Sequence, residues 1–150
     1  MAVDGKIRIE DRAVKAAFAR LIAALPIGGD MTPVMKDIGR ALKTGTQLRF
    51  RSQSSPEGTP WKPSLRAITE GGQTLRLTGR LRNSITFVAS KDAVEIGTNV
   101  VYSAIHQFGG AAGRGGKSKL AARPYLGASE PDKTEILRIV NGYIARAWEL

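Results

Sequence analysis

The sequence contains no cysteine and a single histidine, His106, among its 150 residues. Without cysteine the chain has no disulfide, no thiolate metal site and no cysteine nucleophile, while its redox compartment stays undecided. One histidine excludes a metal site built from several histidines. No apolar run approaches the roughly 20 residues of a membrane span, and the first residues lack the apolar segment of a secretory signal. We therefore expect neither a membrane span nor a secretory signal.

Negative charge is also scarce. Lysine and arginine total 23 against 13 for aspartate and glutamate, which gives a formal net charge of +10. The hydrophobic fraction of 42% is too high for a disordered chain, and a chain of this length can bury a core. The excess is spread along the sequence, with concentrations at 76–82 and 114–123. Such clusters bind phosphate groups or an acidic protein surface, or they form a solvated face that keeps the protein in solution.

Apolar residues at spacings of three and four predict three helices, over 11–25, 32–50 and 129–147. In the second of these, Gly39 and Gly45 lower the intrinsic stability of the helix. Tertiary packing must therefore hold it in place.

Shorter elements are expected between these helices. Period-two alternation predicts a strand near 3–9 and a hairpin over 86–97. Short helices are expected within 75–85 and 102–108, and residues 125–128 are expected to form a strand or an extended return. The sequence therefore predicts an α+β fold, with a small antiparallel β-sheet packed against two N-terminal helices and one C-terminal helix.

Two segments have the composition of long loops. Residues 52–64 hold eight serines, prolines or glycines in thirteen positions, and 109–119 hold five glycines and three basic residues in eleven. We expect the second to be a mobile basic loop. The chain is predicted to form one domain, 1–150, with protruding loop arms at about 52–74 and 109–121.

Catalytic motifs are missing. His106 is the one candidate general base, and no serine lies in a Gly-x-Ser-x-Gly motif. Residues 109–118 end in Gly-Lys-Ser as a P-loop does, but Ala111 stands where the first glycine belongs and no apolar strand precedes it. Acidic residues are scattered, so no metal ligands cluster. We expect no enzyme activity, no cofactor and no metal.

Sequence-specific nucleic-acid modules are missing as well. Aromatic and basic residues do not interleave as they do in RNA-binding sheets, and residues 26–31 separate the first two helices too widely for a helix-turn-helix. Contact with phosphate that ignores base sequence stays open.

Five short motifs follow one another from residue 50 to residue 127. They are Phe50 with Ser-Pro-Glu-Gly-Thr-Pro-Trp-Lys-Pro over 55–63, Leu-Arg-Leu-Thr-Gly-Arg-Leu-Arg-Asn-Ser-Ile over 75–85, Val-Glu-Ile-Gly-Thr over 94–98, Tyr-Ser-Ala-Ile-His-Gln-Phe-Gly over 102–109, and Ala-Arg-Pro-Tyr-Leu-Gly over 122–127. In this order they resemble the signature of the phage virion morphogenesis family of Mu-like and P2-like tailed phages and prophages. Ser103 stands where that signature usually has alanine, a small-for-small change.

The resemblance implies a structural virion protein, a tail-completion or neck protein at the head–tail junction. It further implies a homo-oligomeric ring, of six or twelve subunits by analogy, whose partners are the neighbouring connector or adaptor and the tail terminator or tube proteins. The protein would occupy the host cytoplasm during assembly and the virion afterwards. A head-side stopper or adaptor and a tail terminator are alternatives, and a sequence-independent DNA-binding module is a more distant one.

The resemblance also assigns residues. The motif residues with structural roles are Pro56, Gly58, Trp61, Gly79, Leu81, Tyr102, His106, Gln107, Gly109, Arg123 and Pro124. Trp61 either stiffens a loop that reaches a neighbouring subunit or packs on its own core. His106, Gln107 and Arg123 are expected to tie the short helix to the loop before 125–128. The cations expected to face a DNA channel or an acidic partner are Arg80, Arg82, Arg114, Lys117 and Lys119.

Overall fold

The structure is a computed structural model that describes residues 12–25 and 29–148. The strand expected near 3–9 lies outside the described residues, as does residue 11, the first residue of the helix expected over 11–25.

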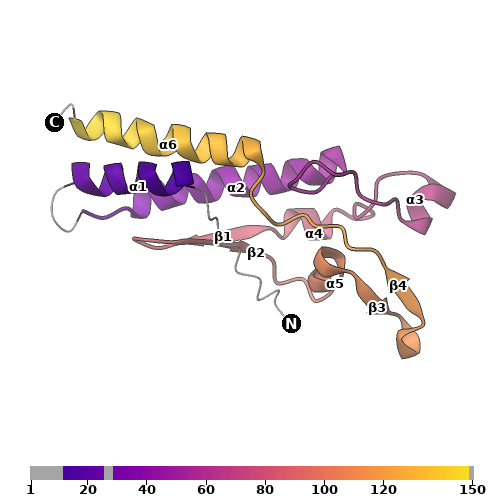
Figure 1. Cartoon of the computed structure of the whole chain (residues 1–150). Coiled ribbons are helices and arrows are strands. Elements are labelled where there is room, and N and C mark those ends of the chain that lie inside the picture. Colours follow the sequence, from indigo (N-terminus) through magenta and orange to yellow (C-terminus); the bar gives the residue numbers. More distant parts are fainter. Residues whose placement is uncertain (1–11, 26–28, 149–150) are drawn as a thin grey trace.

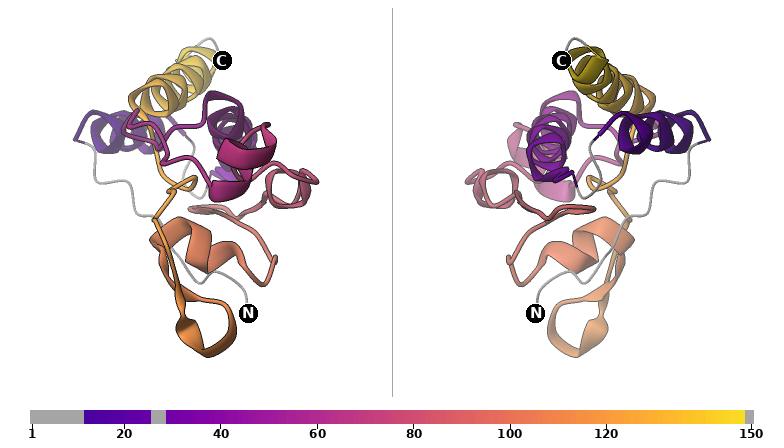
Figure 2. Two further views of the ribbon diagram at one scale, coloured as in Figure 1. Left: turned by 90° about the vertical axis from the view of Figure 1, so that its right-hand side faces the viewer. Right: turned by 90° about the vertical axis from the view of Figure 1, so that its left-hand side faces the viewer.

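Three long helices form one layer of the molecule. They are α1 (Arg12–Ala24), α2 (Thr32–Ser52) and α6 (Glu130–Trp148), which confirms the three expected helices. Figure 1 shows them side by side above the strands, and Figure 2 shows this layering from the two ends of the molecule. The start of α2 is fixed by Asp30, whose carboxylate accepts from the Thr32 backbone N–H at 2.9 Å, and by the following proline.

A two-stranded antiparallel sheet lies against α2. It consists of β1 (Thr86–Ala89) and β2 (Val94–Gly97), paired with Phe87 opposite Ile96, so the hairpin expected over 86–97 is confirmed. A Cβ atom at Gly39 would overlap the Phe87 ring, so the glycine in α2 allows the strand to approach the helix. The residue that weakens the helix is the one that lets the sheet pack.

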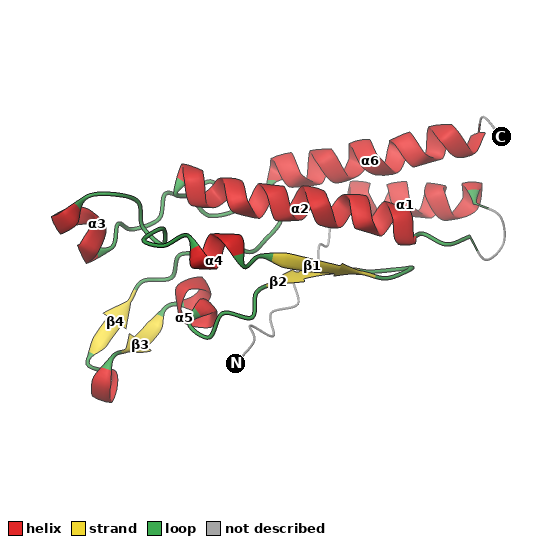
Figure 3. Ribbon diagram, turned by 180° about the vertical axis from the view of Figure 1, so that it is seen from behind, coloured by secondary structure: helices red, strands yellow, loops and turns green. Residues whose placement is uncertain are grey.

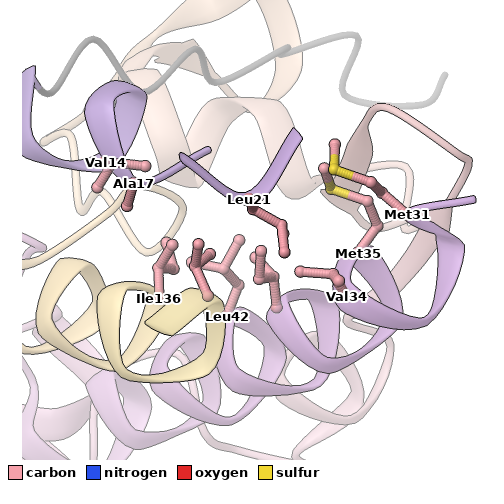
Figure 4. Packing of buried hydrophobic residues seen from close by; sticks show 10 residues of the cluster. Val14, Ala17, Leu21, Met31, Val34, Met35, Leu42 and Ile136 are labelled. Carbon is pink, nitrogen blue, oxygen red and sulfur yellow. The ribbon is translucent and has the colours of Figure 1, made fainter. Parts of the chain in front are cut away.

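The first hydrophobic cluster lies between the three long helices (Figure 4). Ala17 and Leu21 of α1 and Val140 of α6 are fully buried there, and Val34 and Leu42 of α2 complete its centre. The apolar spacing that predicts the helices also predicts these buried faces.

A second cluster lies beyond the C-terminal end of α2. Its centre is Phe50, whose ring centroid is 5.5 Å from that of Trp61 and 5.4 Å from that of Tyr125. Trp61 is buried, so it packs on its own core, the second of the two interpretations given above. The other buried members are Leu81, Ile85, Val100 and Leu126.

The helix expected within 75–85 is shorter than its apolar spacing suggests. Only α4 (Arg80–Asn83) is helical, because Leu75 and Gly79 adopt φ values of 62° and 73°. The helix expected within 102–108 is present as α5 (Ser103–Phe108). Residues 125–128 form an extended return and not a strand.

The segment expected to be a mobile basic loop is a second hairpin. Strands β3 (Gly110–Ala112) and β4 (Ser118–Leu120) pair antiparallel, joined by the short 3-10 helix η1 (Arg114–Gly116). The expectation was wrong because the glycines serve this turn: three of them between residues 113 and 116 have φ values of 67–77°. Gly109 is needed for another reason, since a Cβ there would lie 2.7 Å from the backbone nitrogen of Ala122.

The arm at 52–74 carries a short helix, α3 (Leu65–Glu70), that the sequence analysis did not predict. Figures 1 and 3 show α3 at one end of the molecule, beyond the C-terminal end of α2. None of the helices in the described part of the chain has the length and apolar character needed to cross a membrane.

Candidate functional site

The motif residues lie in and around the second hydrophobic cluster, and none of them lines the groove between α2 and α6. The Trp61 indole donates to the Pro124 carbonyl at 2.8 Å, and Leu81 is buried beside it. Pro56 is buried against Gly127, where a Cβ would lie 2.5 Å from the proline ring. Two of the motif glycines, at 58 and 79, have φ values of 87° and 73° that favour glycine. These residues therefore fix backbone positions.

The Gln107 side chain holds the extended return, residues 125–128, beside α5 through three hydrogen bonds. Its side-chain oxygen accepts from the backbone N–H groups of Tyr125 and Leu126, both at 3.0 Å, and its side-chain nitrogen donates to the Leu126 carbonyl at 3.1 Å. One residue earlier, the His106 carbonyl accepts from the Arg123 N–H at 2.7 Å. The backbone groups that a strand would pair with another strand are thus paired with a side chain, which explains why 125–128 is not a strand.

Arg123 is buried and donates from Nε to the Lys62 carbonyl at 2.6 Å. Its backbone N–H donates to the His106 carbonyl, so Arg123 connects the arm to α5. Burial lowers the pKa of its guanidinium. These contacts place His106, Gln107 and Arg123 in one polar cluster.

His106 has no catalytic partner among the described residues. Burial, and then the charge of Arg123, lower its pKa below 6.5, so the ring is neutral at neutral pH. Its Nδ1 atom is buried without a partner, and Tyr102 packs edge-on against the ring with centroids 5.6 Å apart. Among the described residues, no hydrogen bond joins His106 to a serine or a carboxylate. The pairing of base and nucleophile that covalent catalysis needs is therefore not seen in the described part of the chain.

Arg49 and Asp132 form a buried ion pair that the sequence analysis missed. Arg49 also donates to the carbonyls of Tyr125 and Gly127, at 2.8 and 2.9 Å. Asp132 and Ser129 complete a capping box at the start of α6, with bonds of 3.0 and 3.1 Å. The pair therefore joins α2, the extended return and α6 at one point.

The five predicted cations come from two elements. Arg114, Lys117 and Lys119 lie exposed on the β3–β4 hairpin, whereas Arg80 and Arg82 belong to α4. No acidic residue occurs from 96 to 129, so the charged residues of the hairpin and of the chain on either side of it are all basic.

The two cations of α4 differ in exposure. Arg80 is exposed, with its guanidinium 5.8 Å from the centroid of the Tyr102 ring, whereas Arg82 is half-buried with its Nε atom lacking a partner. The three hairpin cations are all exposed, so the hairpin carries the larger group of accessible cations.

The tip of the 52–74 arm is apolar and exposed. Leu65 and Ile68, one helical turn apart on α3, are 76% and 68% exposed, and no residue of α3 is buried. The base of the arm is fixed, because the Gln53 side chain exchanges two hydrogen bonds with the Thr74 backbone at 2.7 and 3.0 Å. A rigid base thus presents an apolar tip to solvent.

An open groove of about 600 Å³ runs between α2 and α6. Figure 3 shows these two helices in front with α1 behind them, and no α1 residue lines the groove. Leu48, at 54% exposure, is its most exposed large apolar side chain. Tyr143 crosses the groove to donate to Asp37 at 2.6 Å, and the Arg146 guanidinium lies 4.3 Å from the Tyr143 ring centroid.

The groove has no donor set for a metal. Within residues 12–25 and 29–148, no three histidine or acidic side chains gather closely enough to hold an ion. The outer surface therefore offers a basic hairpin, an apolar arm and a groove, all suited to contacts with macromolecules.

Comparison with known proteins points to one family. The model of the phage virion morphogenesis family matches residues 9–145. The chain is 34% identical to "Mu-like prophage FluMu G protein 2" of Haemophilus influenzae, over 74% of this chain and 76% of that protein. It is 26% identical to "Putative capsid assembly protein G" of Escherichia phage Mu, over 98% of both chains. No solved structure matches it.

Proposed function

Because the chain belongs to the phage virion morphogenesis family, we propose that it forms a ring at the head–tail junction. In this role it completes the tail and makes it competent to join a filled head. The observation that supports this proposal is that Trp61, Gln107 and Arg123 bond to the backbone of their own chain, where they fix the base of the arm and the segment that follows the basic hairpin. An arm and a hairpin presented in this way suit a protein that acts by binding other macromolecules.

The proposal includes the absence of catalysis. The one histidine of the chain is neutral, half-buried and joined to no nucleophile among the described residues. The relatives are a prophage G protein and a protein named for capsid assembly, which is in keeping with a role in virion structure.

We place the basic hairpin towards the packaged DNA. Its three cations are exposed and have no acidic residue near them in sequence, so they suit phosphate contacts that ignore base sequence. An acidic patch on a connector or terminator ring is the competing partner for the same charges.

A deletion of the gene tests the proposed role. We expect filled heads and separate tails, and complementation with the wild-type gene should restore joined particles. Normal joined virions from the deletion strain would refute the proposal. Electron microscopy of complemented particles, with the chain labelled, then locates it relative to portal and tube. A position on the portal side would indicate a stopper, and one at the end of the tube a terminator.

A further inference from the structure

The apolar tip of α3 is left exposed by the described part of its own chain. A six-residue helix is too short to persist in water without packing, yet α3 buries none of its residues. Leu65 and Ile68 form an apolar surface one turn long, held out by the fixed base at Gln53 and Thr74. Apolar surfaces presented in this way are typical of docking sites.

The groove between α2 and α6 has the complementary form. It is concave, with apolar side chains that include Leu48 and Ile139 in its lining. One cation of the groove is also available to the arm. Arg40 and Arg138 are paired with carboxylates of their own helices, at 2.6 and 2.5 Å, whereas Arg146 contacts the Tyr143 ring and has no ion pair among the described residues.

Glu70 supplies the matching charge. It is the last residue of α3, it is exposed, and it has no ion pair among the described residues. An arm with an apolar face and a terminal carboxylate therefore corresponds to a groove with an apolar lining and an available guanidinium.

We propose that α3 of one copy docks into the α2–α6 groove of the next copy. The occupant is a second copy because both complementary surfaces lie on this chain. Since the two surfaces are different, the contact is head-to-tail, and a head-to-tail contact closes into a ring when its rotation permits. The inference deepens the proposed ring and rests on it for its biological setting.

The lack of native cysteine makes a cross-linking test specific. Two variants, Ile68→Cys on the arm and Leu48→Cys in the groove, are co-expressed in cells that assemble the particles, and the purified particles are oxidised. We expect a disulfide-linked dimer from the mixture and from neither variant alone. The matched control pairs Ile68→Cys with Val88→Cys, which is also 68% exposed but lies on β1, and should yield no dimer.

The outcomes separate this inference from the proposed function. Dimers from Ile68→Cys alone would show a symmetric arm–arm contact and overturn the inference. Absence of the mixed dimer, in a strain where deletion still prevents joining, would overturn the inference and leave the proposed function intact. A mixed dimer in a strain where deletion has no effect on joining would support the docking contact and overturn the proposed function.

A charge exchange gives a second readout. Glu70→Arg and Arg146→Glu should each cause loss of joined particles, and the double variant should restore them because every interface regains one pair of opposite charges. Failure of the double variant, with both single variants folded and defective, would overturn the inference.

Discussion

Asp132 takes part in both the ion pair and the helix cap that join α2, the extended return and α6. It pairs with Arg49 and caps α6, and both side chains are buried. Asp132→Asn keeps an oxygen for the Ser129 N–H but leaves the guanidinium buried without its counter-charge. We expect the free energy of unfolding to fall by about 3–5 kcal/mol, measured by urea denaturation.

A matched control is available on the same helix. Glu135→Gln removes the carboxylate of the exposed pair with Arg138, and it should leave the urea midpoint close to that of the wild type. Equal effects of the two substitutions would contradict the importance given to the buried pair.

His106 gives the stability a pH dependence. Burial and Arg123 lower its pKa in the folded state, whereas in the unfolded chain the ring takes up a proton at its ordinary value of 6.5. The contribution of neutral His106 to the free energy of unfolding is therefore complete above pH 6.5. It is lost as the pH falls from 6.5 towards the lower pKa of the folded state.

We expect the wild-type melting temperature to fall between about pH 7.5 and pH 5.5, and to fall less in His106→Gln. Thermal unfolding followed by circular dichroism at several pH values measures both. Parallel profiles for the two proteins would show that the pKa of His106 is the same in the folded and the unfolded chain.

Some residue roles could be foreseen and others could not. The motifs pointed to His106, Gln107 and Arg123 as neighbours, and the structure places them together. Arg49 was overlooked although its position carried a signal, since it continues the buried side of α2 through Leu42 and Thr46 at spacings of four and three. A charge on a buried face needs a partner, but the sequence does not say which acid supplies it.

At the scale of elements, glycine-to-alanine substitutions in the long helices distinguish the effect of helix propensity on stability from the effect of packing. Replacing glycine by alanine inside a helix usually stabilises it by up to about 1 kcal/mol. Gly142 in α6 faces open space, so Gly142→Ala should show this gain.

Gly39→Ala and Gly45→Ala should do the opposite. Their Cβ atoms would overlap the Phe87 ring and the Asp132 carboxylate, so we expect destabilisation of about 1–3 kcal/mol. Urea denaturation of the three variants side by side provides the comparison. A gain in stability at position 39 or 45 would show that the neighbours move aside at little cost.

Elements with a sustained period were predictable, and short ones were not. The long helices and the 86–97 hairpin repeat their apolar spacing often enough to be identified. The β3–β4 hairpin was misjudged because glycine-rich composition is shared by flexible linkers and by turns that require positive φ. Helix α3 was missed because six residues hold less than two turns of periodic signal.

At the scale of the whole molecule, the net charge of +10 predicts a salt-dependent affinity for DNA. If the hairpin faces DNA, replacing Arg114, Lys117 and Lys119 by alanine should make the slope of log affinity against log salt shallower by about 0.9 per charge. Titration of a labelled duplex at several salt concentrations measures the slope.

The control removes three other exposed cations. Lys36, Arg51 and Lys91 lie on other elements, and their replacement by alanine should change the slope less than the hairpin variant does. Equal changes in the two variants would show that the hairpin is not a preferred contact for DNA and would contradict its placement towards the packaged DNA.

Helix α2 also gives the molecule a mechanical property. Its 21 residues extend for about 32 Å at 1.5 Å per residue, with Val34 in the first cluster and Phe50 in the second. Close-packed interiors are stiff and transmit strain. A pull on the arm at one end of α2 would therefore act on the three-helix layer at the other end and tilt the whole subunit. In a closed ring, such a tilt would be passed from each subunit to its neighbour, so load arriving at one arm would be shared around the circumference.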